Sequence, residues 1–114
     1  MNKRDRSLLE DMLSYALDAI ELLGSLDADG LLADKRTQYA VVRAVEVIGE
    51  AASKVSAEMR GDLPALPWKS VVGMHNALIH AYPDLDLGTV VLVVRRDLPQ
   101  LVANIRDALG DPTA

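Results

Sequence analysis

Apolar residues recur along residues 4–23 at the spacing of one helical face. They are three or four positions apart, which is the period of an amphipathic α-helix. The set comprises Leu8, Leu9, Met12, Leu13, Ala16, Leu17, Ile20 and Leu23. Gly24 follows and predicts the end of this helix, and the Asp- and Gly-rich segment after it predicts a turn.

A second, longer helix is predicted from Leu31 or Asp34 to Ser56. Its apolar positions spread over a wide arc of the helical wheel, and they are Val41, Ala44, Val45, Ile48, Ala51, Ala52 and Val55. A wide arc favours burial against more than one neighbour, and a second copy of the chain is one candidate. Gly49 lies inside this helix, where glycine costs roughly 1 kcal/mol relative to alanine. Such a glycine is tolerable where another helix approaches closely.

The remaining stripe of this helix is polar and contains Tyr39, Arg43, Glu46, Glu50 and Lys54. Arg43 with Glu46 and Glu50 with Lys54 have the spacing of ion pairs within one helix. One interpretation is a solvated, salt-bridged face. The other is that Glu46 or Glu50 orients a basic residue of the later stretch 68–86.

Residues 59–67 contain Gly61, Pro64 and Pro67 and are predicted to be a connecting loop. A third helix follows over 67–81, with proline suited to its first turn. Proline disfavours helical geometry in the residue before it, so Tyr82, which precedes Pro83, is expected at the helix exit.

Residues 86–109 are predicted to close the fold as helix. The run TVVLVV is rich in β-branched residues, but the chain offers it no partner strand, which favours a buried helix. Apolar positions after Asp97 again follow a helical period. Pro99 predicts either a kink or a new helix capped by Asp97. The sequence therefore predicts an all-α fold.

Composition narrows the class of protein. A chain of 114 residues predicts one domain, over 1–114. It has no Cys, no apolar run of membrane-spanning length and no signal-peptide pattern, so a cytoplasmic protein without a membrane association is expected. The net charge of −5, from 12 Lys and Arg against 17 Asp and Glu, argues against broad electrostatic binding of nucleic acid. It leaves room for a small site that handles one phosphodiester.

Both histidines lie on the third predicted helix. His75 and His80 are about 140° apart around an ideal helix, so they do not share the one-faced spacing that a metal site needs, and no metal or cofactor is predicted. His75 falls on the apolar side, and His80 falls on the polar side with Asn76. Histidine titrates near neutral pH, so His80 suits an acid/base role, although a structural or capping role also fits.

Three stretches resemble the HepT toxins of the HEPN superfamily. They are QYAVVRAVEVIGEAASKVS at 38–56, PWKSVVGMHNALIHAYPDLD at 67–86 and DLPQLVANI at 97–105. The motif of that family is R-x4-H-x-Y, usually within Met-Arg-Asn. This chain supplies its histidine as His80, its tyrosine as Tyr82 and the asparagine as Asn76. His75 stands at the arginine position.

The resemblance implies a four- or five-helix bundle that forms a homodimer, with the motif helices meeting near the two-fold axis. It implies a metal-independent endoribonuclease in which the RNA 2′-hydroxyl attacks the adjacent phosphorus and leaves a 2′,3′-cyclic phosphate. His80 would then be the general base or acid, and Asn76 would position the phosphate. The resemblance also implies a partner, an MNT-type nucleotidyltransferase antitoxin that transfers AMP from ATP to Tyr82.

His75 departs from the family at a catalytic position. Arginine brings five donors and a permanent charge, whereas histidine brings two donors and a charge that fades near neutral pH. Weaker cleavage is therefore expected. Three explanations stay open: the protein is naturally inactive or altered, the substitution was engineered to allow a toxic protein to be produced, or His75 works as a second acid/base group. A helical dimer without catalysis that binds the nucleotidyltransferase is the alternative function.

Overall fold

The computed structural model describes residues 1–80 and 86–110, apart from the side chains of residues 78–80. Within this range the chain is helical, without a strand. The elements are α1 (Lys3–Leu23), α2 (Ala28–Ala33), α3 (Lys35–Lys54), α4 (Ala57–Asp62), α5 (Trp68–His80), α6 (Leu87–Leu92), the π-helical turn η1 (Val93–Asp97) and α7 (Leu98–Leu109). The prediction of an all-α fold is confirmed.

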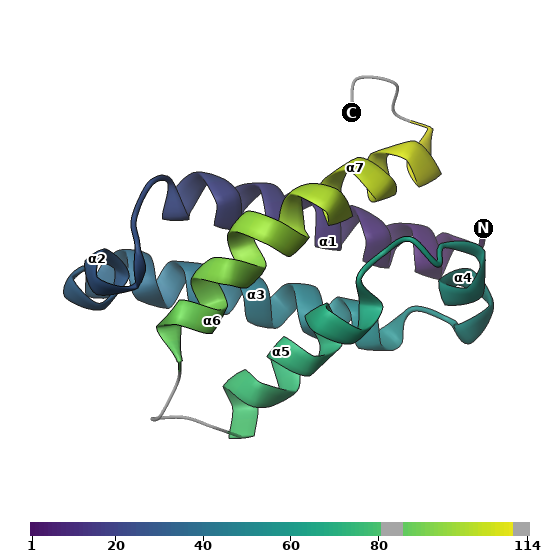
Figure 1. Cartoon of the computed structure of the whole chain (residues 1–114). Helices are drawn as coiled ribbons and strands as arrows, with labels where there is room; N and C mark the ends of the chain where they lie inside the picture. Colours follow the sequence, from purple (N-terminus) through teal and green to yellow (C-terminus); the bar gives the residue numbers. More distant parts are fainter. Residues whose placement is uncertain (81–85, 111–114) are drawn as a thin grey trace.

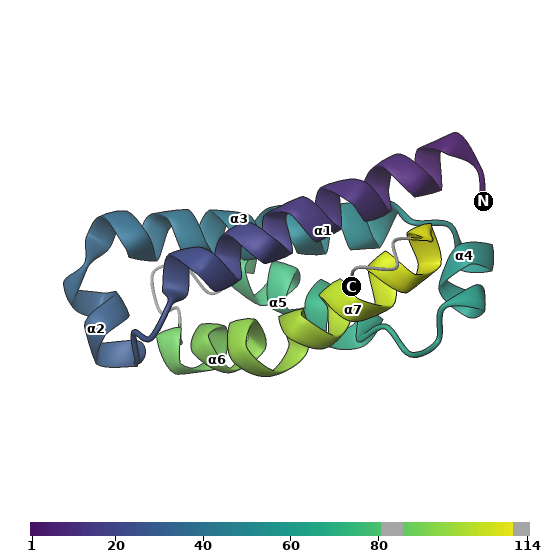
Figure 2. The same cartoon turned by 90° about the horizontal axis from the view of Figure 1, so that it is seen from above.

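The helices form two layers. Seen from above, α1 and α3 lie side by side in one layer, and α5 lies with α6 and α7 in the other (Figure 2). The short helices α2 and α4 lie at opposite ends of α3 (Figure 1). Because α3 contacts both α1 and α5, it is the central helix of the bundle.

Polar side chains begin most of these helices by accepting hydrogen bonds from main-chain N–H groups of the first turn, which have no partner within the helix. The capping residues are Asn2 for α1, Asp27 for α2, Asp34 for α3, Ser56 for α4 and Asp86 for α6. Gly24 and Gly110, both with positive φ, end α1 and α7. The stop predicted at Gly24 is confirmed.

The buried face of α1 differs in detail from the predicted one. Leu9, Met12, Ala16 and Leu23 are buried as expected, but Leu17 is 37% exposed. Ala19 is fully buried in its place. A small side chain at position 19 allows close packing, so a stripe chosen by hydrophobicity alone missed it.

The wide apolar arc of α3 is confirmed, since all seven predicted positions are buried. Within the chain, α1 and α5 already cover this arc from two sides. The arc is therefore explained by the fold of one protomer.

Of the two predicted starts of the second helix, Asp34 is confirmed because it caps α3, whereas Leu31 belongs to the separate helix α2. The helix ends at Lys54, before the predicted Ser56. Residues 59–67 are not all loop, because α4 occupies Ala57–Asp62. The hydroxyl of Ser56 accepts from the Met59 N–H at 3.1 Å and starts that helix.

The TVVLVV run is helical, as predicted, but the new helix was not capped by Asp97. The Asp97 side chain makes no capping hydrogen bond, and its backbone is itself helical. Proline at position 99 cannot donate to the carbonyl four residues earlier and clashes with it. The helix widens there into η1, in which the Leu98 N–H donates to the Val93 carbonyl. Pro99 therefore marks a π-helical turn within one continuous helical path.

None of the helices in the described ranges is both long enough and apolar enough to cross a bilayer.

Candidate functional site

The site-bearing helix α5 lies very close to α3. A Cβ atom built on Gly49 of α3 would lie 2.2 Å from the His75 Cβ and 2.8 Å from the Val71 carbonyl oxygen of α5. Neither distance is possible for real atoms, so only glycine allows this helix crossing. The predicted close approach at Gly49 is confirmed, and the approaching helix is the one that carries the motif.

His75 is half-buried at this crossing. Its Nδ1 lies 2.9 Å from the main-chain carbonyl oxygen of Glu46, one turn before Gly49 on α3. His75 thus lies on the packed side of α5, as its position on the helical wheel predicted. The contact is to the backbone of Glu46 and not to its carboxylate.

The carboxylates of the polar stripe are paired within α3. Glu46 accepts from the Arg43 guanidinium at 2.7 Å, and Glu50 accepts from the Lys54 ammonium at 3.3 Å. Both predicted pairs are present. Each such exposed pair contributes about 0–1 kcal/mol to the free energy of unfolding.

Asn76, next to His75, is exposed. Lys69, seven residues earlier, is exposed as well, and a spacing of seven places it on the same face of α5 two turns away. Lys69 was not among the predicted site residues, although its spacing from Asn76 is visible in the sequence. The described part of α5 therefore presents an amide and a cation to solvent while His75 is held on the packed side.

The side chain of His80 and all of Tyr82 lie outside the described residues. His80 is the last residue of α5. Their predicted roles are not tested by the geometry.

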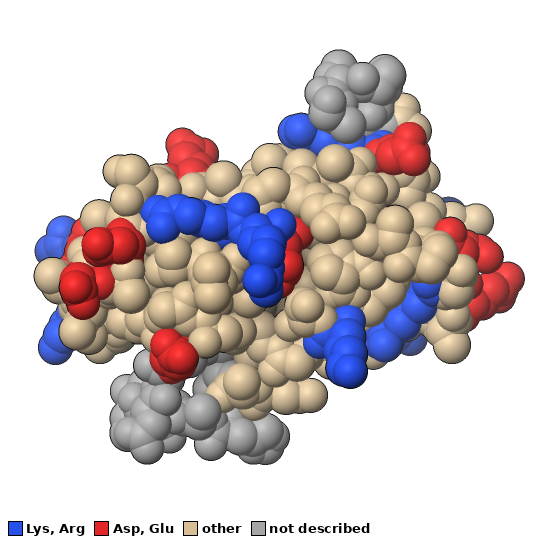
Figure 3. Space-filling view, viewed as in Figure 1, with Lys and Arg blue, Asp and Glu red and all other residues tan. Residues whose placement is uncertain are grey.

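On the face drawn in Figure 3, Lys and Arg side chains form several separated groups, and Asp and Glu side chains lie elsewhere on the same face. The Arg95 guanidinium, between α6 and α7, donates hydrogen bonds to the carbonyls of Gly24 and Leu26. The Arg96 Nε lies 3.3 Å from a carboxylate oxygen of Asp97. Among the described residues, this face therefore shows no continuous cationic surface.

The lowered carboxyl pKa values belong to helix starts. Hydrogen bonds from Thr37 lower the pKa of Asp34, and those from Thr89 lower the pKa of Asp86. Asp5 is the buried acid of the core, and main-chain and hydroxyl hydrogen bonds from Ser56 hold its pKa below the usual range. These groups stabilise helices and lie on other elements than α5.

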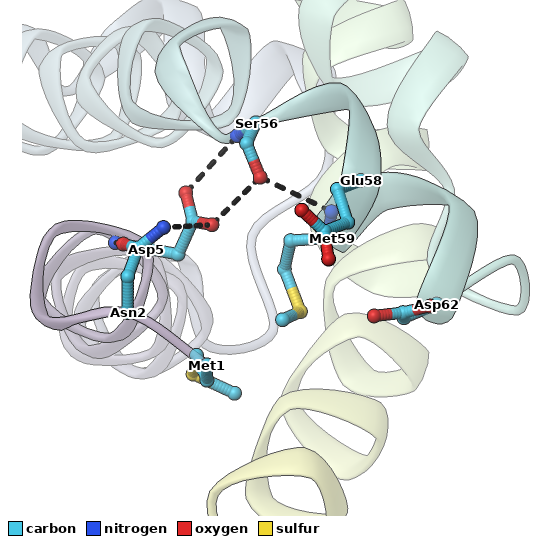
Figure 4. A pocket seen from close by; sticks show the side chains of 7 residues that line it. All are labelled: Met1, Asn2, Asp5, Ser56, Glu58, Met59 and Asp62. Carbon is cyan, nitrogen blue, oxygen red and sulfur yellow. Dashed lines mark hydrogen bonds between the residues drawn. The ribbon is translucent and has the colours of Figure 1, made fainter.

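A pocket opens beside Asp5 at the end of the bundle (Figure 4). It is lined by Met1, Asn2, Asp5, Ser56, Glu58, Met59 and Asp62. Asp5 accepts from the Ser56 N–H at 3.0 Å and from its hydroxyl at 2.7 Å. The network ties α1 to the start of α4 and involves the polar atoms of Asn2, Asp5 and Ser56. Among the described residues, no group of three His, Cys, Asp or Glu side chains is arranged to hold a metal ion.

Comparison with known proteins shows the family of the chain. The family model described as "Ribonuclease HepT-like" matches residues 12–108. The chain belongs to the HepT-like ribonuclease family. The match covers most of the chain and spans α5 in full.

Relatives agree with this assignment. The chain is 38% identical over 102 residues to "Putative RNase MJ1380" of Methanocaldococcus jannaschii, covering 89% of this chain and 94% of that protein. It is 34% identical over 102 residues to "Probable ribonuclease HepT" of Thermococcus cleftensis, covering 89% and 92%. No solved structure matches.

Proposed function

We propose that this HepT-like protein is a metal-independent endoribonuclease that acts as the toxin of a cytoplasmic toxin–antitoxin pair. The observation that carries the proposal is the family match across α5, together with relatives of nearly the same length that are named as RNases. The exposed Asn76 and Lys69 support it, because an amide and an ammonium on one helical face suit a phosphodiester.

The proposed reaction is attack of the RNA 2′-hydroxyl on the adjacent phosphorus, which leaves a 2′,3′-cyclic phosphate. His80 transfers a proton as general base or acid, and Asn76 positions the phosphate. His75 takes the place of the motif arginine, with fewer donors and no permanent charge. A homodimer would bring two copies of α5 together at one site.

The test compares RNA cleavage by the chain with cleavage by its His75→Arg and His80→Ala variants. We expect weak cleavage ending in cyclic phosphate and none with His80→Ala. His75→Arg should cleave about 10²–10³ times faster, because that is the usual effect of one transition-state donor. Undetectable cleavage by both the chain and His75→Arg would contradict the proposal.

Neutralisation is proposed to occur by AMP transfer from ATP to Tyr82, catalysed by an MNT-type nucleotidyltransferase antitoxin. Added phosphate would place negative charge where substrate phosphate binds. Intact mass after incubation with that partner and ATP should increase by AMP, and Tyr82→Phe should abolish the increase. An adduct that survives in Tyr82→Phe would place the modification elsewhere.

The presence of His75 in place of arginine favours one second candidate, a non-catalytic helical dimer that binds the nucleotidyltransferase. Both functions predict a particle of twice the mass of one chain in light scattering. They differ at His80, because loss of RNA cleavage or of growth inhibition in His80→Ala would exclude the non-catalytic dimer.

A further inference from the structure

The hydrogen bond of His75 determines where its proton lies. A main-chain carbonyl oxygen has no hydrogen and can only accept. Because Nδ1 is 2.9 Å from the Glu46 oxygen, Nδ1 must carry the hydrogen in both the neutral and the protonated imidazole. The carbonyl has two lone pairs, so it can accept from His75 while it also serves the helical hydrogen bond of α3.

The short distance between the helices makes this bond possible. Gly49 faces the Cβ of His75, and any side chain there would meet atoms of α5 at 2.2–2.8 Å. This clash cannot be relieved by moving the flexible end of a neighbouring side chain, because the atoms met are the His75 Cβ and the Val71 main-chain oxygen. A larger residue at 49 would therefore push α5 away and lengthen the contact between Nδ1 and the carbonyl.

We propose that Gly49 and the main-chain carbonyl of Glu46 hold His75 as its Nδ1–H tautomer, which leaves Nε2 as the nitrogen that exchanges protons. The proposal rests on the proposed function for its chemical consequence. Gly49 is in this sense a positioning residue for His75. The described residues give Nε2 no hydrogen-bond partner of its own.

The position of this proton determines what His75 can do at the motif's arginine position. An arginine there can only donate hydrogen bonds, whereas neutral His75 accepts a proton at Nε2 and protonated His75 donates one from it. In the proposed cleavage, the bond from the 2′-oxygen to phosphorus forms as the 2′ proton passes to an acceptor. The bond to the 5′-oxygen breaks as that oxygen receives a proton. His75 can serve either proton transfer through Nε2.

Nuclear magnetic resonance tests the tautomer without any cleavage assay. Long-range proton–nitrogen correlation spectra of the full ¹⁵N-labelled chain are recorded well above the ordinary histidine pKa of about 6.5. His75 should show a protonated, pyrrole-type Nδ1 and an unprotonated, pyridine-type Nε2. The His80→Asn variant identifies which signals belong to His75. A proton on Nε2, or shifts averaged between the two tautomers, would overturn the proposal.

The glycines of the two helices provide a matched pair of variants. Gly49→Ala should lose the Nδ1–H signature and give averaged shifts. Gly73→Ala, in α5 itself, should keep it, because a Cβ at Gly73 meets nothing within 4 Å. An unchanged signature in Gly49→Ala would overturn the role of Gly49. If Gly49→Ala fails to fold, the spectrum of the unmodified chain still decides the tautomer.

The His75→Asn variant separates anchoring from proton transfer. Its amide nitrogen can take the place of Nδ1 and donate to the Glu46 carbonyl, but it offers no basic nitrogen in place of Nε2. We expect normal folding and a loss of RNA cleavage of about 10²–10⁴-fold, the range of general acid–base catalysis. Full cleavage by His75→Asn would show that His75 only anchors α5. Absence of cleavage by the unmodified chain and by His75→Arg would instead contradict the proposed function, while the spectra judge the tautomer separately.

Discussion

Asp5 joins two helices that are distant in the sequence. Its carboxylate accepts from the N–H and hydroxyl of Ser56, 51 residues away, and the same hydroxyl accepts from the Met59 N–H at the start of α4. The residue is 3% exposed, so water cannot replace these bonds easily. One carboxylate thereby orders the first turn of α1 and the connection from α3 to α4.

This network predicts acid sensitivity. Since the pKa of Asp5 is lowered by folding, its stabilising effect is present above the unfolded value of about 3.9 and is lost as pH falls through the folded value. Asp5→Asn should lower the thermal midpoint at pH 7, and the difference from the unmodified chain should shrink at pH 3. Circular dichroism melts at both pH values measure this.

Asp11→Asn is the control for that experiment. Asp11 is an exposed acid on the same helix and should change the midpoint little at either pH. A difference between Asp5→Asn and the unmodified chain that stays constant from pH 7 to pH 3 would contradict the assignment of the effect to Asp5 ionisation.

At the scale of elements, the crossing of α3 and α5 depends on one missing side chain. Glycine disfavours a helix, so Gly49 lowers the intrinsic stability of α3 by roughly 1 kcal/mol. The packing of His75 and Val71 against that position offsets this cost. The two glycines of α3 and α5 should therefore respond to alanine in opposite directions.

Urea unfolding measures this difference. Gly49→Ala should lower the free energy of unfolding by about 1–3 kcal/mol, the usual cost of overpacking. Gly73→Ala should raise it by up to about 1 kcal/mol, because it gains helix propensity without a clash. Stabilisation by both substitutions would show that α5 can move away from α3 without loss.

These elements also show how far sequence reasoning extends. The long helices, the stop at Gly24 and the close approach at Gly49 follow from periodicity and from glycine's missing side chain. Helix α4 was not predicted, because its six residues are too few to show a helical period, although Ser56 is a recognisable cap. The π-helical turn was not predicted, because the spacing of apolar residues does not distinguish a bulged helix from a kinked one.

The candidate site also has features that the sequence predicts and others that it does not. Resemblance predicted Asn76 as a motif residue, and the structure shows that it is exposed on α5. Spacing predicted the polar pairs of α3, which the structure confirms. The partner of His75 could not be found, because a main-chain carbonyl leaves no trace in the identity of a residue. The polar stripe suggested that the carboxylate of Glu46 or Glu50 orients a basic residue of 68–86, whereas the contact to His75 comes from the backbone of Glu46.

At the scale of the whole molecule, the described residues form one hydrophobic core between the two layers of helices. Ile48 lies at its centre, fully buried on α3 between α1 and α5. Trp68 begins α5 in the other layer, where its indole donates to the Leu63 carbonyl. Its fluorescence thus reports the second layer, while circular dichroism reports all helices.

If the layers unfold together, a cavity in one destabilises both. Ile48→Ala should lose about 2–5 kcal/mol, and the fluorescence and circular dichroism transitions should shift by the same amount. Leu32→Ala, at a site 62% exposed, should change stability by only about 0.5 kcal/mol or less. Separate transitions for the two probes in Ile48→Ala would show that the layers are independent.

The contact between His75 and a carbonyl has a consequence for the variation that this fold tolerates. Every residue that keeps α3 helical at position 46 supplies the same oxygen, so exchanges of Glu46 leave the anchor in place. Position 49 has no such freedom, because a Cβ there would lie 2.2 Å from the His75 Cβ. A library of substitutions should therefore find position 46 permissive and position 49 restricted to glycine, although the two residues lie one turn apart and serve the same histidine.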